Sequence, residues 1–281
     1  MKPRLHVLLA RRATTAVVFR RGPSGVVAAV GWDRARDTFE LGQWLKGRIY
    51  ERRADLSPDG RYLIYFAMNG HWQNRVKGAW TAVSKAPYLT PVTLLAKGDC
   101  WNGGGLFVDD THYWLNDGYG HTVVEDSTEV HRADPSAFER RYGGEDWGVY
   151  FHRLQRDGWA MRGDRASSTV VFERPLTHGW TLRKLAIAQS GVPGKGVYHD
   201  EHELLHTASG RELARPAWEW ADLDRDRVVW AEGGCLWARE LTKASATLDD
   251  PVERPRMLHD FAPMHFEAIP PPPAAKRRKR R

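Results

Sequence analysis

The stretch Ala54-Asp55-Leu56-Ser57-Pro58-Asp59-Gly60-Arg61-Tyr62-Leu63-Ile64-Tyr65 decides the expected fold. Its centre is a tight turn, since proline presets the backbone, aspartate bonds its own main chain and glycine accepts a positive φ. An apolar, aromatic-rich run follows the turn at once, which is the pattern of a buried strand. The stretch therefore predicts two short strands joined by an acidic turn.

The same pattern returns later in the chain as an internal repeat. Ala221-Asp222-Leu223-Asp224-Arg225-Asp226-Arg227-Val228-Val229-Trp230 has a shorter turn and the same entry into an apolar strand. Looser copies surround two further aspartates, and the acidic turn centres are Asp59, Asp109, Asp157 and Asp224. Intervals of about 50 residues are typical of repeated multi-stranded units. The last interval is longer and has room for an inserted loop.

Short alternating or β-branched runs cover the rest of the chain and predict an all-β fold. They are Thr15–Arg20, Val26–Trp32, Tyr62–Met68, Ala79–Val83, Leu106–Val108, Tyr113–Leu115, Gly148–Leu154, Thr169–Phe172, Trp180–Ile187 and Arg227–Ala231. The clearest helical candidate is a turn or two near Asp134–Arg141, where Asp134-Pro135 provides a start signal.

The segment Leu56–Leu63 resembles the repeat of TolB-type and WD-type β-propellers, and Ala221–Ala238 resembles it less closely. In those families a Ser-Pro-Asp-Gly turn joins two inner strands of a blade. The resemblance implies a β-propeller-like fold of roughly five blades, the first of them around Val17–Trp32, and it carries no catalytic residue. A pair of β-sandwiches is the structural alternative.

Charge and composition divide the chain into two parts. The last six residues supply six of the seven net positive charges, so the preceding part is nearly neutral. We expect residues 1–262 to form the propeller-like domain and residues 263–281 to be a disordered tail, in which Pro270–Pro273 is an extended spacer. Weak, salt-sensitive contact with nucleic acid is the role expected of the basic residues Lys276, Arg277, Arg278, Lys279, Arg280 and Arg281.

The run His202-Glu203-Leu204-Leu205-His206 fits the H-E-x-x-H pattern of zinc proteases. That chemistry requires a helix, on which the two imidazoles meet one zinc ion; on a strand they are about 13 Å apart. The following Ser209-Gly210 reads as a hairpin turn. We therefore predict a hairpin and no metal site, and His202, Glu203 and His206 are zinc ligands only in the alternative that this segment is helical.

Candidate ligand-binding residues lie around the glycine-rich loop Gly98–Gly105, whose glycines permit close backbone approach. Aromatic, amide, carboxylate and imidazole groups of this kind suit a small-molecule or carbohydrate site. The residues selected are Trp72, Asp99, Trp101, Asn102, His112 and Trp114. His71 is a further side chain to test. The competing interpretation is a connecting loop with a buried tryptophan.

Paired carboxylates offer a catalytic alternative. Asp55, Asp109, Asp157 and Asp222 occupy comparable points of the repeats, and glycan-acting hydrolases use two such acids. Acidic residues at these points are also ordinary turn formers.

No phosphate-loop, dinucleotide-binding or G-x-S-x-G motif occurs, so we expect no cofactor. The first apolar run, His6–Ala10, is too short for a signal peptide, and no later stretch is long enough to span a membrane. We therefore expect a cytoplasmic protein that does not bind membranes.

The function expected first is a non-catalytic binding or scaffold module that recognises a protein or small molecule through propeller loops. Two alternatives stand beside it. One is a hydrolase, glycan-acting or zinc-dependent, and the other is a nucleic-acid-associated protein tethered by its basic tail.

Overall fold

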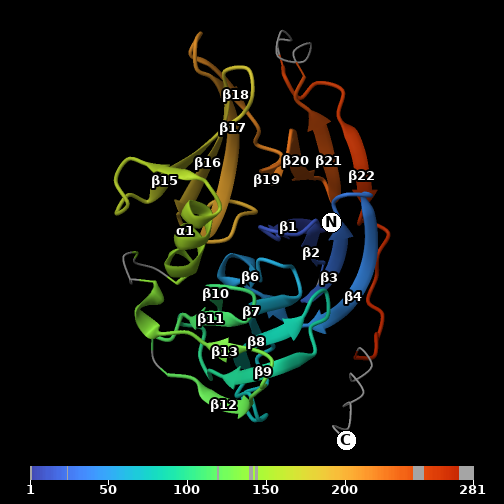
Figure 1. Cartoon of the computed structure of the whole chain (residues 1–281), viewed down its shortest axis with the longest axis vertical. Coiled ribbons are helices and arrows are strands. Elements are labelled where there is room, and N and C mark those ends of the chain that lie inside the picture. The colour runs from blue at the N-terminus through green and yellow to red at the C-terminus, as the bar shows by residue number, and fades with distance from the viewer. Residues whose placement is uncertain are drawn as a thin grey trace, which may run out of the picture.

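The computed structural model describes residues 2–23, 25–118, 120–138, 142, 145–242 and 250–271. The described residues form five β-sheets, each of three to six strands, with one short α-helix between the third and the fourth (Figure 1). The all-β expectation is confirmed. The strand pairs are antiparallel except for one two-residue parallel contact in the third sheet.

We number the sheets 1 to 5 in chain order. Sheet 1 is a meander of β1 (Arg4–Leu9), β2 (Thr15–Arg21), β3 (Val26–Asp33) and β4 (Thr38–Lys46). Sheet 2 contains β5 (Arg48–Ile49), β6 (Asp55–Leu56), β7 (Tyr62–Met68), β8 (Ala79–Lys85), β9 (Pro91–Ala96) and β12 (Thr122–Glu125). Sheet 3 contains β10 (Gly105–Phe107), β11 (His112–Leu115) and β13 (His131–Arg132).

The last two sheets are simple meanders. Sheet 4 consists of β14 (Ala160–Arg162), β15 (Thr169–Pro175), β16 (Trp180–Ala188), β17 (Tyr198–His206) and β18 (Arg211–Ala214). Sheet 5 consists of β19 (Trp218–Asp224), β20 (Arg227–Glu232), β21 (Cys235–Glu240) and β22 (Arg256–Asp260). The acidic turns at Asp59, Asp109 and Asp224 each join two strands, as the repeat predicts.

The helical segments are η1 (Glu51–Arg53), η2 (Pro135–Ala137) and α1 (Trp147–Arg156). The start signal at Asp134 is confirmed for η2, because its carboxylate accepts a hydrogen bond from the Ser136 amide at 2.8 Å. The strand predicted over Gly148–Leu154 is wrong: that segment lies in α1, and Asp157 follows the helix instead of a strand.

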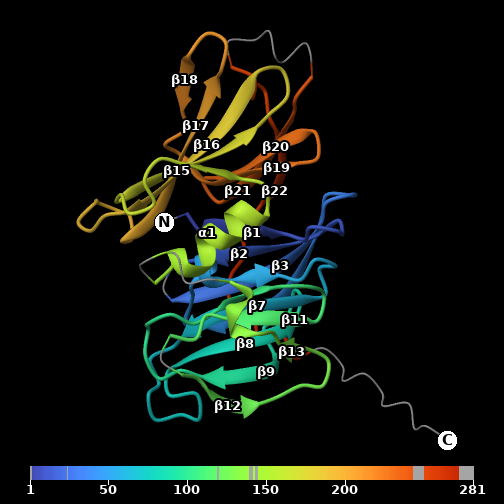
Figure 2. The ribbon, with the colours of Figure 1, turned by 60° about the vertical axis from the view of Figure 1, so that its left-hand side comes forward.

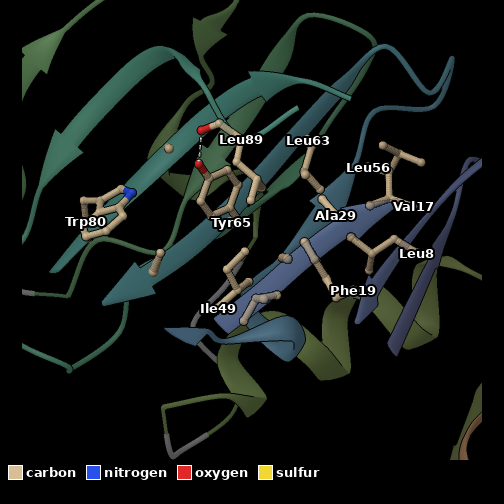
Figure 3. Close-up of a cluster of buried hydrophobic side chains, with 14 of the residues drawn as sticks. Leu8, Val17, Phe19, Ala29, Ile49, Leu56, Leu63, Tyr65, Trp80 and Leu89 are labelled. Carbon is tan, nitrogen blue, oxygen red and sulfur yellow. Dashed lines mark hydrogen bonds between the residues drawn. The ribbon is translucent and has the colours of Figure 1, made fainter. Parts of the chain in front are cut away.

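The sheets pack face to face, and the alternation of side chains along each strand explains why both faces are apolar. On β2, Val17 and Phe19 contact sheet 2, whereas Ala16 and Val18 contact sheet 5. Figure 3 shows the cluster between sheets 1 and 2, in which the Tyr65 hydroxyl donates to the Leu89 carbonyl at 2.6 Å. A strand buried on both faces needs apolar residues at every position, which is the pattern of β2, β3 and β7.

Apolar clusters also connect the remaining neighbours. Sheets 2 and 3 share one cluster, sheet 3 and α1 share a second, and α1 packs with sheets 4 and 5 in a third. The first strand of the chain, β1, contacts both β6 of sheet 2 and β19 of sheet 5. Figures 1 and 2 show β1 between these two sheets, with α1 close to it.

The segment after β22 runs along sheet 1. Arg20 donates to the Met264 carbonyl at 2.8 Å, Gln43 donates to the Ile269 carbonyl at 3.2 Å, and the Lys46 ammonium lies over the Phe266 ring. These contacts hold part of the segment for which disorder is expected. The basic residues 276–281 lie outside the described residues.

Candidate functional site

The predicted glycine-rich loop is exposed at its tip and tightly packed at its base. Trp101 is 55% exposed, and Asp99 accepts hydrogen bonds from the Lys97 ammonium and the Trp101 amide, both at 2.9 Å. Gly104, with φ +72°, lies so close to Arg53 that an added Cβ would be 1.9 Å from the Arg53 carbonyl oxygen. Gly104 therefore permits the loop backbone to approach Arg53 of the same chain closely.

The buried side chain of Arg53 holds this loop in place through hydrogen bonds. Its guanidinium is buried, pairs with Asp146 at 2.6 Å and with Glu145 at 2.5 Å, and donates to the Cys100 and Asn102 carbonyls. The hydrogen bonds span chain separations of 47 to 93 residues. Arg53 therefore ties the loop to η1 and to the start of α1.

The remaining predicted ligand-binding residues are dispersed. Trp72 is half-exposed on the loop before β8, where its ring covers Gly78. His112 lies at the far end of the β10–β11 hairpin from Asn102 and pairs with Asp109 at 2.9 Å. Trp114 is buried, and its indole donates to the Pro135 carbonyl at 3.0 Å. The ligand role of these six residues stays a prediction.

The histidine motif is extended, as the hairpin prediction states. His202 and His206 both lie in β17, which pairs with β18 through the turn at Ser209 and Gly210. The helix on which the zinc alternative depends is absent from this segment. Across the described part of the chain, no group of three or more histidine, cysteine or acidic side chains is placed to hold a metal ion.

A cavity of about 670 Å³ lies where β1, α1, sheet 4 and β19 meet. Its walls are the end of β1 and the following turn, the last turns of α1 with Trp159, Lys184 of β16, and the end of β19 with the turn that follows it. Three of the four predicted carboxylates, Asp55, Asp157 and Asp222, line it, whereas Asp109 does not. The cavity is large enough for a small organic ligand.

Positive charge dominates the cavity walls. Beside the three carboxylates, the lining contains eight cationic side chains: Arg11, Arg12, Arg34, Arg153, Arg156, Arg174, Lys184 and Arg225. A concave wall with an excess of one sign of charge concentrates ligands of the opposite sign. The cavity therefore favours anions.

Carboxylates pair with part of this charge. Arg156 holds Asp55 with two hydrogen bonds of 2.7 and 2.8 Å and contacts Asp157 at 2.9 Å, and Arg174 pairs with Asp222. Burial raises the pKa of Asp157, although Arg156 opposes this shift.

Within the described residues, no carboxylate lies within 4.0 Å of Arg11, Arg153 or Lys184. Arg153 donates instead to the carbonyls of Glu51 and Ala54 and to His6 Nε2 at 3.0 Å. Since arginine only donates, His6 accepts through Nε2, and burial lowers the pKa of this histidine well below its usual value.

The Lys184 ammonium is the most enclosed of the three. Lys184 is 1% exposed, and its Nζ lies 4.7 Å from the centre of the Trp159 ring and 5.9 Å from that of the Tyr150 ring. Burial lowers the pKa of Lys184 because the charged form loses its hydration.

Behind Lys184 lies a buried polar cluster on β17 and α1. The Tyr150 hydroxyl donates to Asp200 Oδ2 at 2.7 Å, and Arg52 donates to the same oxygen at 3.1 Å. Two buried atoms of this cluster, Asp200 Oδ1 and His202 Nε2, have no hydrogen-bond partner among the described residues. Burial lowers the pKa of His202 to about 3, so this imidazole is neutral.

Only some of the residues that line this cavity can be predicted from the sequence. Lys184 could have been found, because it occupies an inward position in the alternation Leu182, Lys184, Ala186 of β16. The position of Arg153 does not follow from the sequence, because its segment predicts a strand and lies in α1 instead. The role of Arg11 depends on a tertiary neighbourhood that spacing does not encode.

Comparison with protein-family models and with curated proteins found no match to this chain. No helix among the described residues is long and apolar enough to cross a membrane.

Proposed function

We propose that this chain is a propeller-like binding module of about five blades that holds a small anionic ligand in its cationic cavity. Support for the ring arrangement comes from the apolar clusters between successive sheets and from β1, which contacts both β6 and β19. In such a ring the first strands of the blades surround a central cavity. No cofactor is part of this proposal.

The observation that carries the ligand class is the uncompensated charge of the cavity. Arg11, Arg153 and Lys184 line it without a carboxylate partner in the described structure. A phosphate or carboxylate group would supply the missing partner through charge-assisted hydrogen bonds. Ligands that carry either group share this chemistry.

Calorimetric titration of the full chain with inorganic phosphate, pyrophosphate and citrate tests the proposal at low ionic strength. Arg11→Gln should weaken binding about tenfold or more, the loss of one charge-assisted hydrogen bond. Arg75→Gln is the matched control, since Arg75 is exposed, pairs with Glu125 and does not line the cavity. The proposal is wrong if none of the three anions binds, or if both variants weaken binding equally.

The glycan-acting hydrolase remains the second candidate, and one observation favours it. Asp157 lines the cavity beside Asp55, and burial raises its pKa, as a general acid requires. Asp157→Asn should then abolish cleavage of an aryl glycoside, with Asp164→Asn, on an exposed turn, as control. Absence of cleavage by the native chain across aryl glycosides would remove this candidate.

A further inference from the structure

Lys184 is a buried amine that the fold leaves without an ionic partner. Its inward position on β16 would suit a leucine or valine. Leu182, two residues earlier on the same face of the strand, is such a residue. Among the described residues, no hydrogen bond or ion pair satisfies its Nζ. Buried lysines are rare unless paired, because the unpaired ammonium loses its hydration without compensation.

Two carboxylates interact electrostatically with Lys184, and each is engaged through one oxygen, while Asp200 Oδ1 has no hydrogen-bond partner among the described residues. Asp200 accepts from Tyr150 and Arg52, and Asp222 accepts from Arg174. The charged and titratable groups around Lys184 come from five elements: Asp200 and His202 on β17, Asp222 on β19, Tyr150 and Arg153 on α1, Arg52 on η1, and His6 on β1. Burial, Arg153 and Arg52 together outweigh the two carboxylates and lower the pKa of the amine.

A desolvated lysine beside other cations carries more neutral amine at ordinary pH than an exposed lysine does. Lys184 also lines the cavity, so a ligand in the cavity can reach it. These are the two conditions for a lysine nucleophile.

We propose that Lys184 forms a Schiff base with an aldehyde or ketone that carries a phosphate or carboxylate group. This inference rests on the proposed function, because the cationic walls would bind the anionic group and bring the carbonyl carbon to Nζ. Arg11 and Arg153 are the cavity arginines without a carboxylate partner among the described residues, and they donate only to main-chain carbonyls and, for Arg153, to His6.

The reaction balances without an oxidant or reductant. The lone pair of neutral Nζ attacks the carbonyl carbon, a C–N bond forms as the C=O π bond breaks, and a proton passes from nitrogen to the oxygen to give a carbinolamine. Loss of water, with the proton that leaves nitrogen, gives the C=N bond. His202 lies opposite Lys184 on β17, and its Nε2 has no hydrogen-bond partner among the described residues. Burial lowers the pKa of His202, which makes it a poor base, and the reaction above transfers no proton to it.

Borohydride trapping tests the inference on the full chain. Pyridoxal 5′-phosphate is the phosphate-bearing probe, pyruvate is the carboxylate-bearing probe, and pyridoxal is the probe without phosphate. Borohydride reduces the C=N bond to a stable secondary amine, which peptide mass spectrometry locates. We expect one label per chain on Lys184 at low probe concentration, at least tenfold more label from pyridoxal 5′-phosphate than from pyridoxal, and suppression by inorganic phosphate.

Two variants sharpen the result. Lys184→Arg keeps the charge without the nucleophile and should lose the label, whereas Lys77→Arg, at an exposed site, should keep it. Mapping of the native chain locates the label even if Lys184→Arg does not fold. Labelling of Lys184 should also persist to lower pH than labelling of exposed Lys77, because burial lowers the pKa of Lys184.

The inference is overturned if the label falls on exposed lysines while Lys184 stays unmodified. Labelling of Lys184 to the same extent by pyridoxal overturns the anion requirement. These failures differ from failure of the proposed function. If phosphate binds in calorimetry but Lys184 does not react, the binding module stands and the nucleophile does not.

Discussion

Replacing Gly104 with alanine should destabilise the protein through two separable effects. Gly104 has φ +72°, where a side chain is strained, and an added Cβ would lie 1.9 Å from the Arg53 carbonyl oxygen. Arg53 cannot withdraw freely, because it pairs with Asp146 and donates to the Cys100 carbonyl. The loop would have to move away from sheet 2 and weaken these bonds.

The left-handed backbone costs about 1–2 kcal/mol for alanine. The steric overlap adds about 1–3 kcal/mol, the range for overpacking a tight interior. Gly194 separates the two effects, since it has the same φ of +72° and no atom within 4 Å of an added Cβ. Gly194→Ala should therefore show the backbone cost alone.

Urea unfolding followed by tryptophan fluorescence measures both variants. We expect the free energy of unfolding to fall by about 2–5 kcal/mol for Gly104→Ala and by about 1–2 kcal/mol for Gly194→Ala. Equal losses would show that Arg53 does not restrict this loop. The glycine-rich loop would then again be free to serve a ligand.

Three further changes test the buried polar groups by urea unfolding. Lys184→Met removes an unpaired buried ammonium and should stabilise by about 1–2 kcal/mol near neutral pH; since burial lowers the pKa of Lys184, the gain should shrink as pH rises towards its unfolded value of 10.5. Burial raises the pKa of Asp37, but hydrogen bonds from Arg227 and Arg256 bring it down to about 2. Asp37→Asn should lower the free energy of unfolding by about 1 kcal/mol near pH 7, allowing for partial exposure. The difference in this free energy between the variant and the native chain should vanish as pH falls from 3.8 through about 2. Tyr65→Phe leaves the Leu89 carbonyl without its donor and should cost about 1 kcal/mol at every pH from about 5 to 9.

Most strands could be predicted because their signals are local. Tyr62–Met68 is a strand with the predicted bounds, and the acidic turn at Asp59 precedes it as expected. The hairpin at His202–His206 could likewise be inferred, because Ser209-Gly210 is a turn signal and the flanking residues alternate. β1 (Arg4–Leu9) is not among the predicted strands, since the overlapping apolar run His6–Ala10 is weighed only as a signal peptide.

The helix α1 could not be separated from a strand by composition. Val149, Tyr150 and Phe151 are β-branched or aromatic, which favours a strand. Trp147, Tyr150, Phe151 and Leu154 also follow the i, i+3, i+4, i+7 spacing of a helix, and this face is buried against sheets 4 and 5. Packing of this face against sheets 4 and 5 selects the helix over the strand. The helix in turn puts Arg153 beside the cavity.

The distribution of paired and unpaired cations is the strongest reason to treat the cavity as functional. Five of its eight cations have a carboxylate partner within 4.0 Å: Arg12, Arg34, Arg156, Arg174 and Arg225. The chain therefore supplies a carboxylate partner for each of these five cations. Arg11 and Arg153 donate to main-chain carbonyls, but no carboxylate of the described residues balances their charge or that of Lys184, and replacing an unbalanced buried charge with an apolar residue commonly stabilises a protein. A ligand that brings its own negative charge explains why all three line one cavity, and an electrophilic carbon on that ligand would explain why one of the three is a lysine.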